Sequence, residues 1–219
     1  IELTRLDLPT NKALIGFAGA PWTVVTYMIE GGSSRDFAET RQWLWLNPKK
    51  FEALIDYMTQ ATINFLTMQA RAGADVLMLF DSWASVVPAE RRDQFIIAPI
   101  RKIVRTLRAQ GNKQPIIGFP KGIGEGIIAY SEKAEIDVLA IDHMTDAEWV
   151  DKVLPQSMPV QGNLDPLSLL AGGSQMMDSI DYILDSFKDR PHIFNLGHGI
   201  TPPTPVSNVE QMVQWVRKS

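Results

Sequence analysis

Side chains able to bind or transfer a proton follow the apolar runs of this sequence, at the points where strands would end. The carboxyl ends of parallel strands meet at one edge, where the loops of α/β proteins carry the chemistry. The positions are Tyr27, on the segment after Gly19; Asp81 and Ser82; Lys121; Asp142 and His143; Gln161, Asn163 and Asp165; and Asn195 and His198. We therefore predict a polar site built from several strand ends.

His198 stands between two glycines, in "GHG", directly after the last apolar run. Glycines remove side-chain bulk and let a ligand approach the backbone closely, so we expect His198 to be exposed as a donor, acid or ligand. His143 is a weaker candidate, and His192 begins a strand. With three histidines on separate elements and no cysteine, a metal site is not favoured.

Tyr27 follows Thr23 by four residues and precedes Glu30 by three, so it lies on the more polar side of a helix over 21–30. A core tyrosine with a satisfied hydroxyl is the alternative. Lys121 stands where a barrel aldolase would hold a Schiff-base lysine, but we favour the alternative of a solvated or carboxylate-paired lysine.

The acidic residues at strand ends have two interpretations. Asp81 and Asp142 could act as general bases, or they could cap the helix that follows each strand. Asp165 precedes Pro166, the pattern of an N-cap followed by proline in the first turn. We expect Asp165 to be a cap.

Six short apolar runs predict strands, because each is nearly continuously apolar, as in parallel strands covered on both faces. They are 13–19, 75–81, 115–121, 137–142, 158–163 and 192–199. Helical patterns lie between them, at 21–30, 34–46, 48–74, 88–111, 122–134, 145–153, 165–171, 174–188 and 206–218. Pro48 and Gly73 mark the ends of the longest helix, and Pro99 should kink or divide the helix over 88–111.

Strict alternation of strands and helices predicts a parallel α/β fold, either a doubly wound sheet or a (β/α)8 TIM barrel. No helix opens with G-x-G-x-x-G, which weakens the doubly wound alternative. We predict a single domain over residues 1–219, an incomplete barrel with about six of its eight βα units. The chain begins with Ile1, so we expect about two units to be missing from its front.

The composition of the chain argues against two classes of binding partner, nucleic acids and membranes. A net charge of −4 offers no basic excess for nucleic acid, and no apolar run approaches the roughly 18 residues that span a bilayer. Without a charged-then-apolar leader, we expect a cytoplasmic protein that binds neither nucleic acid nor membrane.

Four motifs, in order and spacing, resemble the uroporphyrinogen decarboxylase family: "GFAGAPWTVVTYMIEGGSS", "LFDSW", "QGNLDP" and "FNLGHGI". The resemblance implies a (β/α)8 barrel, usually homodimeric, that converts uroporphyrinogen to coproporphyrinogen without a cofactor, removing the carboxyl groups of four acetate side chains. It places Tyr27, Ser82 and His198 at the family's catalytic and substrate-binding tyrosine, hydroxyl and histidine positions.

The family's arginine-rich motif and its pyrrole-binding aspartate have no counterpart in these 219 residues. We therefore expect this chain alone to be inactive. The alternatives are a non-catalytic porphyrinogen-binding relative and a Schiff-base aldolase that uses Lys121. A zinc-dependent methyltransferase of the same superfamily is disfavoured, because it needs thiolates and the chain has no cysteine.

Overall fold

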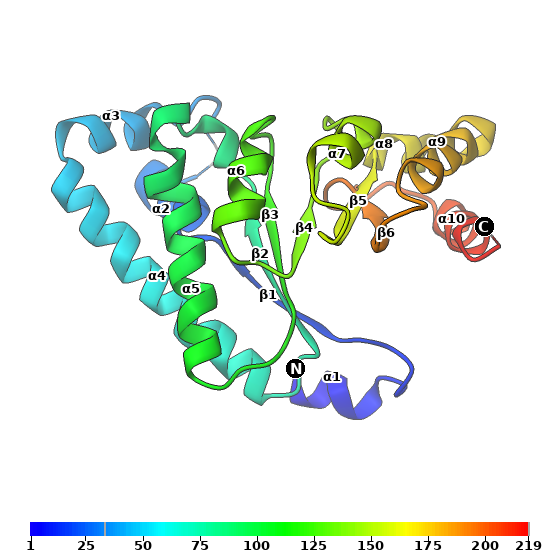
Figure 1. Ribbon diagram of the computed structural model, residues 1–219, viewed down its shortest axis with the longest axis horizontal. Coiled ribbons are helices and arrows are strands. Elements are labelled where there is room, and N and C mark those ends of the chain that lie inside the picture. Colours follow the sequence, from blue (N-terminus) through cyan, green and yellow to red (C-terminus); the bar gives the residue numbers. More distant parts are fainter. Residues whose placement is uncertain (33, 219) are drawn as a thin grey trace. The chain divides into compact units, whose positions relative to one another are not determined.

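The computed structural model describes residues 1–32 and 34–218, and its six strands lie in the order β1-β2-β3-β4-β5-β6 (Figure 1). The strands are β1 Ile15–Gly19, β2 Val76–Asp81, β3 Ile116–Pro120, β4 Val138–Ala140, β5 Val160–Leu164 and β6 His192–Leu196. The helices are α1 Glu2–Asp7, α2 Pro21–Glu30, α3 Ala38–Leu46, α4 Pro48–Arg71, α5 Ala98–Ala109, α6 Gly126–Lys133, α7 Ala147–Val153, α8 Pro166–Ala171, α9 Gly173–Ser186 and α10 Val206–Val216.

The strand order confirms the predicted fold class. The strands pair in parallel, for example Ile15 with Val76 and Leu77 with Ile116, and each is followed by at least one helix. A doubly wound sheet would reverse its strand order at a switch point, whereas here the order follows the chain. The fold is therefore of the TIM-barrel class, with six βα units in the described part of the chain.

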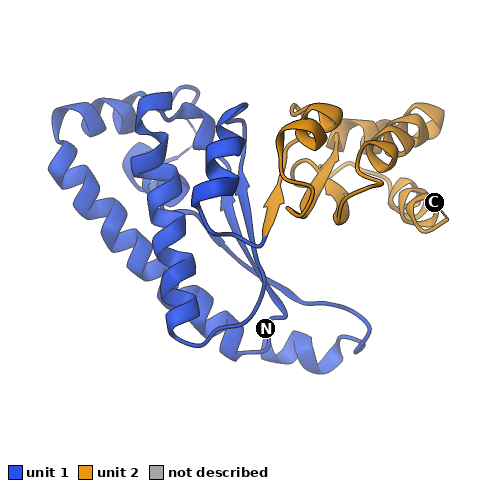
Figure 2. Cartoon of the chain, in the orientation of Figure 1, with its two compact units in different colours: residues 1–137 blue, residues 138–219 orange. Residues whose placement is uncertain are grey.

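Two compact units make up the chain, residues 1–137 and residues 138–219 (Figure 2). The first holds β1 to β3 with α1 to α6, and the second holds β4 to β6 with α7 to α10. The single-domain interpretation of residues 1–219 stays a prediction.

Helix α4 begins and ends as its sequence predicts. Pro48 occupies the first turn, where its missing N–H costs nothing, and Gly73, with φ of +98°, follows the last turn. Its buried side chains recur every three or four residues, at Phe51, Ile55, Thr59 and elsewhere along one face. That face packs on β1, α2 and α5, so α4 and α5 lie side by side (Figure 1).

The helix predicted over 88–111 is divided, as Pro99 indicates. Two short 3₁₀ turns and a π-helical turn, Asp93–Ile97, precede α5, and Pro99 lies in the first turn of α5. Proline is tolerated there because the N–H groups of a first turn have no intrahelical acceptor. The division turns Phe95 inward, where it is 2% exposed.

An aromatic cluster holds α2 in the core of the first unit. The ring centroid of Trp22 lies 5.7 Å from that of Phe51 and 6.3 Å from that of Phe95. Phe51 and Phe95 meet edge to face at 5.3 Å. Burying each phenylalanine contributes roughly 1.5–3 kcal/mol. These ring contacts fix the buried face of α2 and thereby set the orientation of its exposed face.

The second unit is stabilised by a buried arginine. Arg190 is 5% exposed, and its guanidinium donates to the Asp151 carboxylate at 2.7 Å and to the backbone carbonyls of Asp151 and Leu154. A guanidinium can satisfy several acceptors at once, so it closes the carboxyl end of α7. Asp146 caps the other end by accepting from Trp149 N at 2.7 Å.

Candidate active site

Helix α2 places Tyr27 after the first strand. Ala20 is extended and Pro21 starts the helix, so the chain turns directly from β1 into α2. Gly31 ends it in the left-handed conformation, with φ of +67°, and its N–H donates to Tyr27 O at 3.1 Å. Glu30 accepts from the Thr40 N–H and hydroxyl, which ties α2 to α3.

Tyr27 lies at the surface. Its side chain is 49% exposed, which excludes the core-tyrosine alternative for this chain. Its ring meets Trp83 edge to face, with centroids 6.4 Å apart and planes at 83°. Trp83 also packs on Phe37 at 4.8 Å. The tyrosine is thus held on one side by an aromatic ring and presents its other side to solvent.

Ser82 directly follows β2 and is half-buried. It lies between Asp81 and Trp83 in the chain, and both of these residues form hydrogen bonds with α2. Thr23 Oγ1 donates to Asp81 Oδ1 at 2.6 Å, and Trp22 Nε1 donates to Trp83 O at 3.0 Å. Trp83 is thus a neighbour of both residues: its ring packs on that of Tyr27, and Ser82 precedes it in the chain.

The sequence leaves two interpretations for Asp81, a general base or a cap of the helix that follows its strand, and the structure does not support the cap. It is 1% exposed, and its carboxyl group accepts a hydrogen bond from the Thr23 hydroxyl, which lies on a helix that precedes it in the chain. Burial raises the pKa of its carboxyl to about 7, although the hydrogen bond from Thr23 acts to lower it. A carboxyl group with such a pKa can be neutral near physiological pH.

Tyr130 of α6 is the other buried titratable group near this strand end. It is fully buried, and within residues 1–32 and 34–218 its hydroxyl has no hydrogen-bond partner. Burial, and then the nearby Asp81 carboxylate, raise the pKa of Tyr130 well above its usual range. It remains a neutral phenol under β3, where a Cβ on Gly118 would lie 2.5 Å from its hydroxyl.

His198 belongs to the second unit, where it follows β6 and is exposed as expected. One of the two flanking glycines, Gly197, is explained by packing within the unit. A Cβ on Gly197 would lie 2.2 Å from His143 N, so a glycine is needed there to let the backbone at His143 approach closely. Gly199 has open space around its Cβ position.

The other two histidines are held inside the second unit. His192 is bonded through Nε2 to Gly162 O at 2.7 Å, and burial lowers its pKa. His143 is half-buried, and its Nδ1 has no hydrogen-bond partner among the described residues. His143 also lines a pocket of about 330 Å³ with Asn163, Asp146 and Tyr182.

One of the acidic strand-end residues caps a helix as predicted. Asp165 caps α8 by accepting from Leu167 N at 2.9 Å, with Pro166 in the first turn. The N-cap of α7 is Asp146, whereas Asp142 accepts from Met144 N at 2.9 Å within the turn after β4. Lys121 is half-buried at the end of β3, and its backbone N–H donates to Asp81 O at 3.1 Å.

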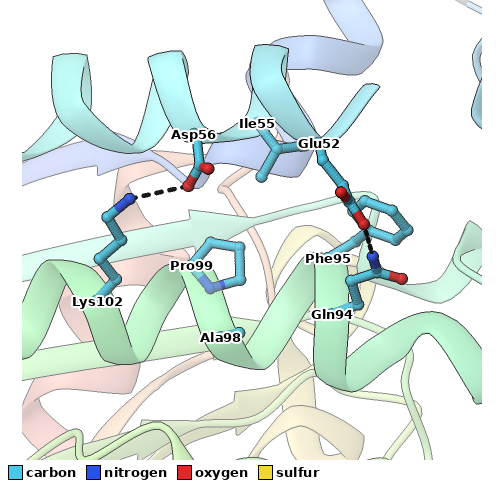
Figure 3. Close-up of a pocket in the computed structure, with 8 residues that line it drawn as sticks. All are labelled: Glu52, Ile55, Asp56, Gln94, Phe95, Ala98, Pro99 and Lys102. Carbon is cyan, nitrogen blue, oxygen red and sulfur yellow. Dashed lines mark hydrogen bonds and ion pairs between the residues drawn. The ribbon is translucent and has the colours of Figure 1, made fainter. Parts of the chain in front are cut away.

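A second pocket, of about 200 Å³, lies between α4 and α5 (Figure 3). A Lys102–Asp56 ion pair of 2.9 Å and a Gln94–Glu52 hydrogen bond close its two ends. Its lining residues are Glu52, Ile55, Asp56, Gln94, Phe95, Ala98, Pro99 and Lys102. None of them is a strand-end residue, so this pocket is separate from the residues that the sequence singles out.

Within residues 1–32 and 34–218, no three His, Cys, Asp or Glu side chains gather as metal ligands would. Among the same residues, none of the helices is both long and apolar enough to cross a bilayer.

Sequence comparison gives relatives along the whole chain. The uroporphyrinogen decarboxylase (URO-D) family profile matches residues 1–219. Uroporphyrinogen decarboxylase of Maricaulis maris is 47% identical over 211 residues, which cover 96% of this chain and 61% of that protein. The Sphingopyxis alaskensis protein of the same name is also 47% identical and is covered to 62%. The chain thus spans about three-fifths of the length of these curated relatives.

Solved structures share the fold at low sequence identity. A methyltransferase from Methanosarcina mazei superposes with a TM-score of 0.84 at 20% identity, over 99% of this chain and 62% of that one. A B12-independent methionine synthase from Shewanella sp. W3-18-1 gives 0.70 at 14% identity, over 99% and 65%. These likenesses establish the barrel fold, and the sequence relatives establish the family: the chain belongs to the uroporphyrinogen decarboxylase family.

Proposed function

We propose that the intact protein decarboxylates the four acetate side chains of uroporphyrinogen, which gives coproporphyrinogen and four molecules of CO₂. The observation that carries this proposal is the family match over residues 1–219, together with 47% identity to a uroporphyrinogen decarboxylase. The exposed Tyr27 and His198, both placed after strands, add support because such positions are typical of barrel active sites.

Each decarboxylation needs a place for the electron pair of the breaking C–C bond. Protonation of a pyrrole ring carbon creates a cation that accepts this pair as CO₂ leaves. The methylene carbon then takes up a proton to become a methyl group, and the ring carbon releases the proton it had gained, so one proton is consumed for each CO₂. Groups that stabilise the cation and hold the carboxylates lower the barrier. No step requires an oxidant or a reductant.

We assign roles in holding the substrate and stabilising the cation to three residues of this chain. Tyr27 forms a hydrogen bond close to the reacting pyrrole, Ser82 contacts a substrate carboxylate or Tyr27, and His198 donates to a substrate side chain. Tyr27 and Ser82 suit a shared task because both adjoin Trp83. The mostly apolar α2 offers the macrocycle a surface to pack beside.

The test replaces each residue in the intact protein, as Tyr27→Phe, Ser82→Ala and His198→Asn. We expect kcat/KM for coproporphyrinogen formation to fall about 10-fold or more in each, the usual loss on removing one such donor being of this order or greater. Tyr57→Phe is the control, because Tyr57 is 71% exposed on α4 and lies outside the strand ends. Unchanged rates in all three variants would reject these roles.

The activity of the 219-residue chain by itself is a separate question. We infer that it is inactive, because it spans about three-fifths of its relatives and lacks counterparts of the family's arginine-rich motif and aspartate. Turnover by this chain beside the intact protein tests that inference. Substrate binding without turnover would indicate the porphyrinogen-binding alternative, and borohydride trapping at Lys121 would indicate the aldolase.

We also infer a homodimer in the cytoplasm that needs no cofactor. The support is the family relationship. Sedimentation equilibrium of the intact protein tests the dimer, cell fractionation tests the location, and activity after exhaustive dialysis against chelators tests the cofactor.

A further inference from the structure

A buried carboxyl group and a buried hydroxyl join β2 to α2. Asp81 is 1% exposed and Thr23 is 4% exposed. Thr23 Oγ1 donates to Asp81 Oδ1 at 2.6 Å, a short bond of the kind made to carboxylate acceptors. The two residues are 58 positions apart, so only the folded chain brings them together.

The same hydroxyl has a second role. Thr23 Oγ1 accepts a hydrogen bond from Trp83 N at 3.2 Å while it donates to Asp81. Trp22 Nε1 donates to Trp83 O at 3.0 Å. Both backbone polar groups of Trp83 are therefore held by side chains in the first turn of α2. Ser82 lies between the two anchored residues and has little freedom to shift.

The network also extends to Tyr27. Thr23 lies four residues before Tyr27, and residues with this spacing stack on one face of a helix. The Tyr27 ring rests edge-on against the Trp83 ring at 6.4 Å. A change at Thr23 would thus reach Ser82 through the backbone of the turn and Tyr27 through the Trp83 ring.

We propose that Asp81 and Thr23 are positioning residues, which lock the 82–83 turn against α2 so that Ser82 and Tyr27 face the substrate as one rigid pair. This inference rests on the proposed function, since it presumes that both residues contact the tetrapyrrole. Neither Asp81 nor Thr23 touches substrate in this proposal. They act through the turn.

General stability is a poor explanation for this arrangement. Burying a carboxyl group costs free energy, and well-packed apolar residues often stabilise a core as well or better. The carboxyl–hydroxyl pair instead provides a defined geometry, because the Asp81 oxygen fixes the direction of the Thr23 hydroxyl hydrogen. The hydroxyl lone pair is then left facing Trp83 N.

The test uses Thr23→Val, which removes the hydroxyl but keeps the shape, with Thr23→Ser and Asp81→Asn as conservative variants. Thr26→Val is the matched control. Thr26 lies on the same helix, is fully buried, and donates its hydroxyl to Thr23 O at 2.7 Å without reaching the 82–83 turn. Thermal unfolding of each variant in the intact protein establishes that it is folded.

Two readouts are measured on the intact protein. The first is the steady-state rate with uroporphyrinogen. We expect Thr23→Val to lower kcat about 10-fold or more with KM changed less than about 3-fold, whereas Thr23→Ser, Asp81→Asn and Thr26→Val stay within about 3-fold of wild type. Asn keeps the acceptor oxygen, so Asp81→Asn separates geometry from charge.

The second readout is amide hydrogen exchange in peptides that cover Trp83, which needs no substrate. Exchange should be about 10-fold faster or more in Thr23→Val and unchanged in Thr26→Val, because only the first removes the acceptor of the Trp83 N–H.

Three results would overturn the inference: equal loss of kcat in Thr23→Val and Thr26→Val, unchanged exchange at Trp83 in Thr23→Val, or loss of activity in Asp81→Asn with exchange unchanged. The last would show that the charge acts directly. If wild-type protein shows no decarboxylation, the proposed function and the catalytic part of this inference both fail, while the exchange data still decide whether Thr23 anchors the turn.

Discussion

Asp81 should make the stability of the protein depend on pH. Its carboxyl pKa is raised from 3.8 to about 7 in the folded state, mainly by burial. The folded protein then holds a proton that the unfolded chain releases, so the free energy of unfolding should fall as pH rises from about 4 to 7. The shift corresponds to a loss of at most roughly 4 kcal/mol.

The measurement is urea unfolding of wild type and Asp81→Asn at several pH values from 4 to 8. The difference between the two proteins isolates Asp81 from the other titrating groups. Within the described residues it interacts with the Thr23 hydroxyl of α2 and the Tyr130 phenol of α6, and neither ionises in this range. A difference that stays constant across this pH range would contradict the prediction.

At the residue scale, the exposure of two site residues could be predicted from the sequence, but the hydrogen-bond partner of Asp81 could not. An exposed Tyr27 and an exposed His198 follow from local patterns, because polarity along one helix and glycines around a histidine are visible in the sequence. The partner of Asp81 is not visible, because Thr23 lies in another βα unit. A carboxyl group at a strand end has the same sequence pattern whether it caps a helix, as Asp165 does, or bonds to a distant hydroxyl.

At the scale of elements, the packing of α6 on β3 leaves no room at Gly118. A Cβ there would lie 2.5 Å from the Tyr130 hydroxyl and 3.1 Å from Ile136. We expect Gly118→Ala to destabilise the protein by about 1–3 kcal/mol through overpacking. Chemical denaturation measures the loss. Gly32→Ala is the control, because its Cβ would meet no atom within 4 Å, and a loss of equal size there would refute the steric explanation.

Asp146 links two helices of the second unit. Its Oδ1 caps α7 by accepting from Trp149 N at 2.7 Å, and its Oδ2 accepts from the Tyr182 hydroxyl of α9 at 2.9 Å. Asp146→Ala removes both bonds and should cost about 1–2 kcal/mol. Tyr182→Phe removes only one and should cost about half as much. Equal losses in the two variants, measured by urea unfolding, would show that the cap contributes nothing.

The elements themselves were largely predictable, since their ends carry Pro and Gly. Pro48 and Gly73 bracket α4, and Pro99 marks the division before α5. The short helix α1 was not predicted, because its six residues bury no side chain and so show no apolar periodicity. The π-helical turn Asp93–Ile97 was missed because a single extra residue per turn leaves no distinct sequence pattern.

At the scale of the whole molecule, the chain ends its sheet at β1, which pairs only with β2 in the described residues. Ile15 and Phe17 on this strand are 43% and 60% exposed. An apolar edge strand is a template for pairing with other chains. We expect the 219-residue chain by itself to associate as its concentration rises, measured by sedimentation velocity.

Ile15→Lys should reduce this association, because a charge on an edge strand opposes pairing. Tyr57→Lys is the control, since Tyr57 is exposed on α4 and not on a strand. If both variants reduce association equally, net charge and not the strand edge is responsible.

The sequence predicted the barrel class and the number of units, because both depend on the alternation of strands and helices.

The position of Trp83 also makes it a built-in optical probe. Its indole packs between the rings of Tyr27 and Phe37, and its buried Nε1 has no hydrogen-bond partner in the described part of the chain. Indole emission depends on the polarity around the ring. A molecule that docks beside Tyr27 should therefore shift the emission maximum and change the intensity of Trp83 fluorescence. Binding could then be measured by intrinsic fluorescence without a label.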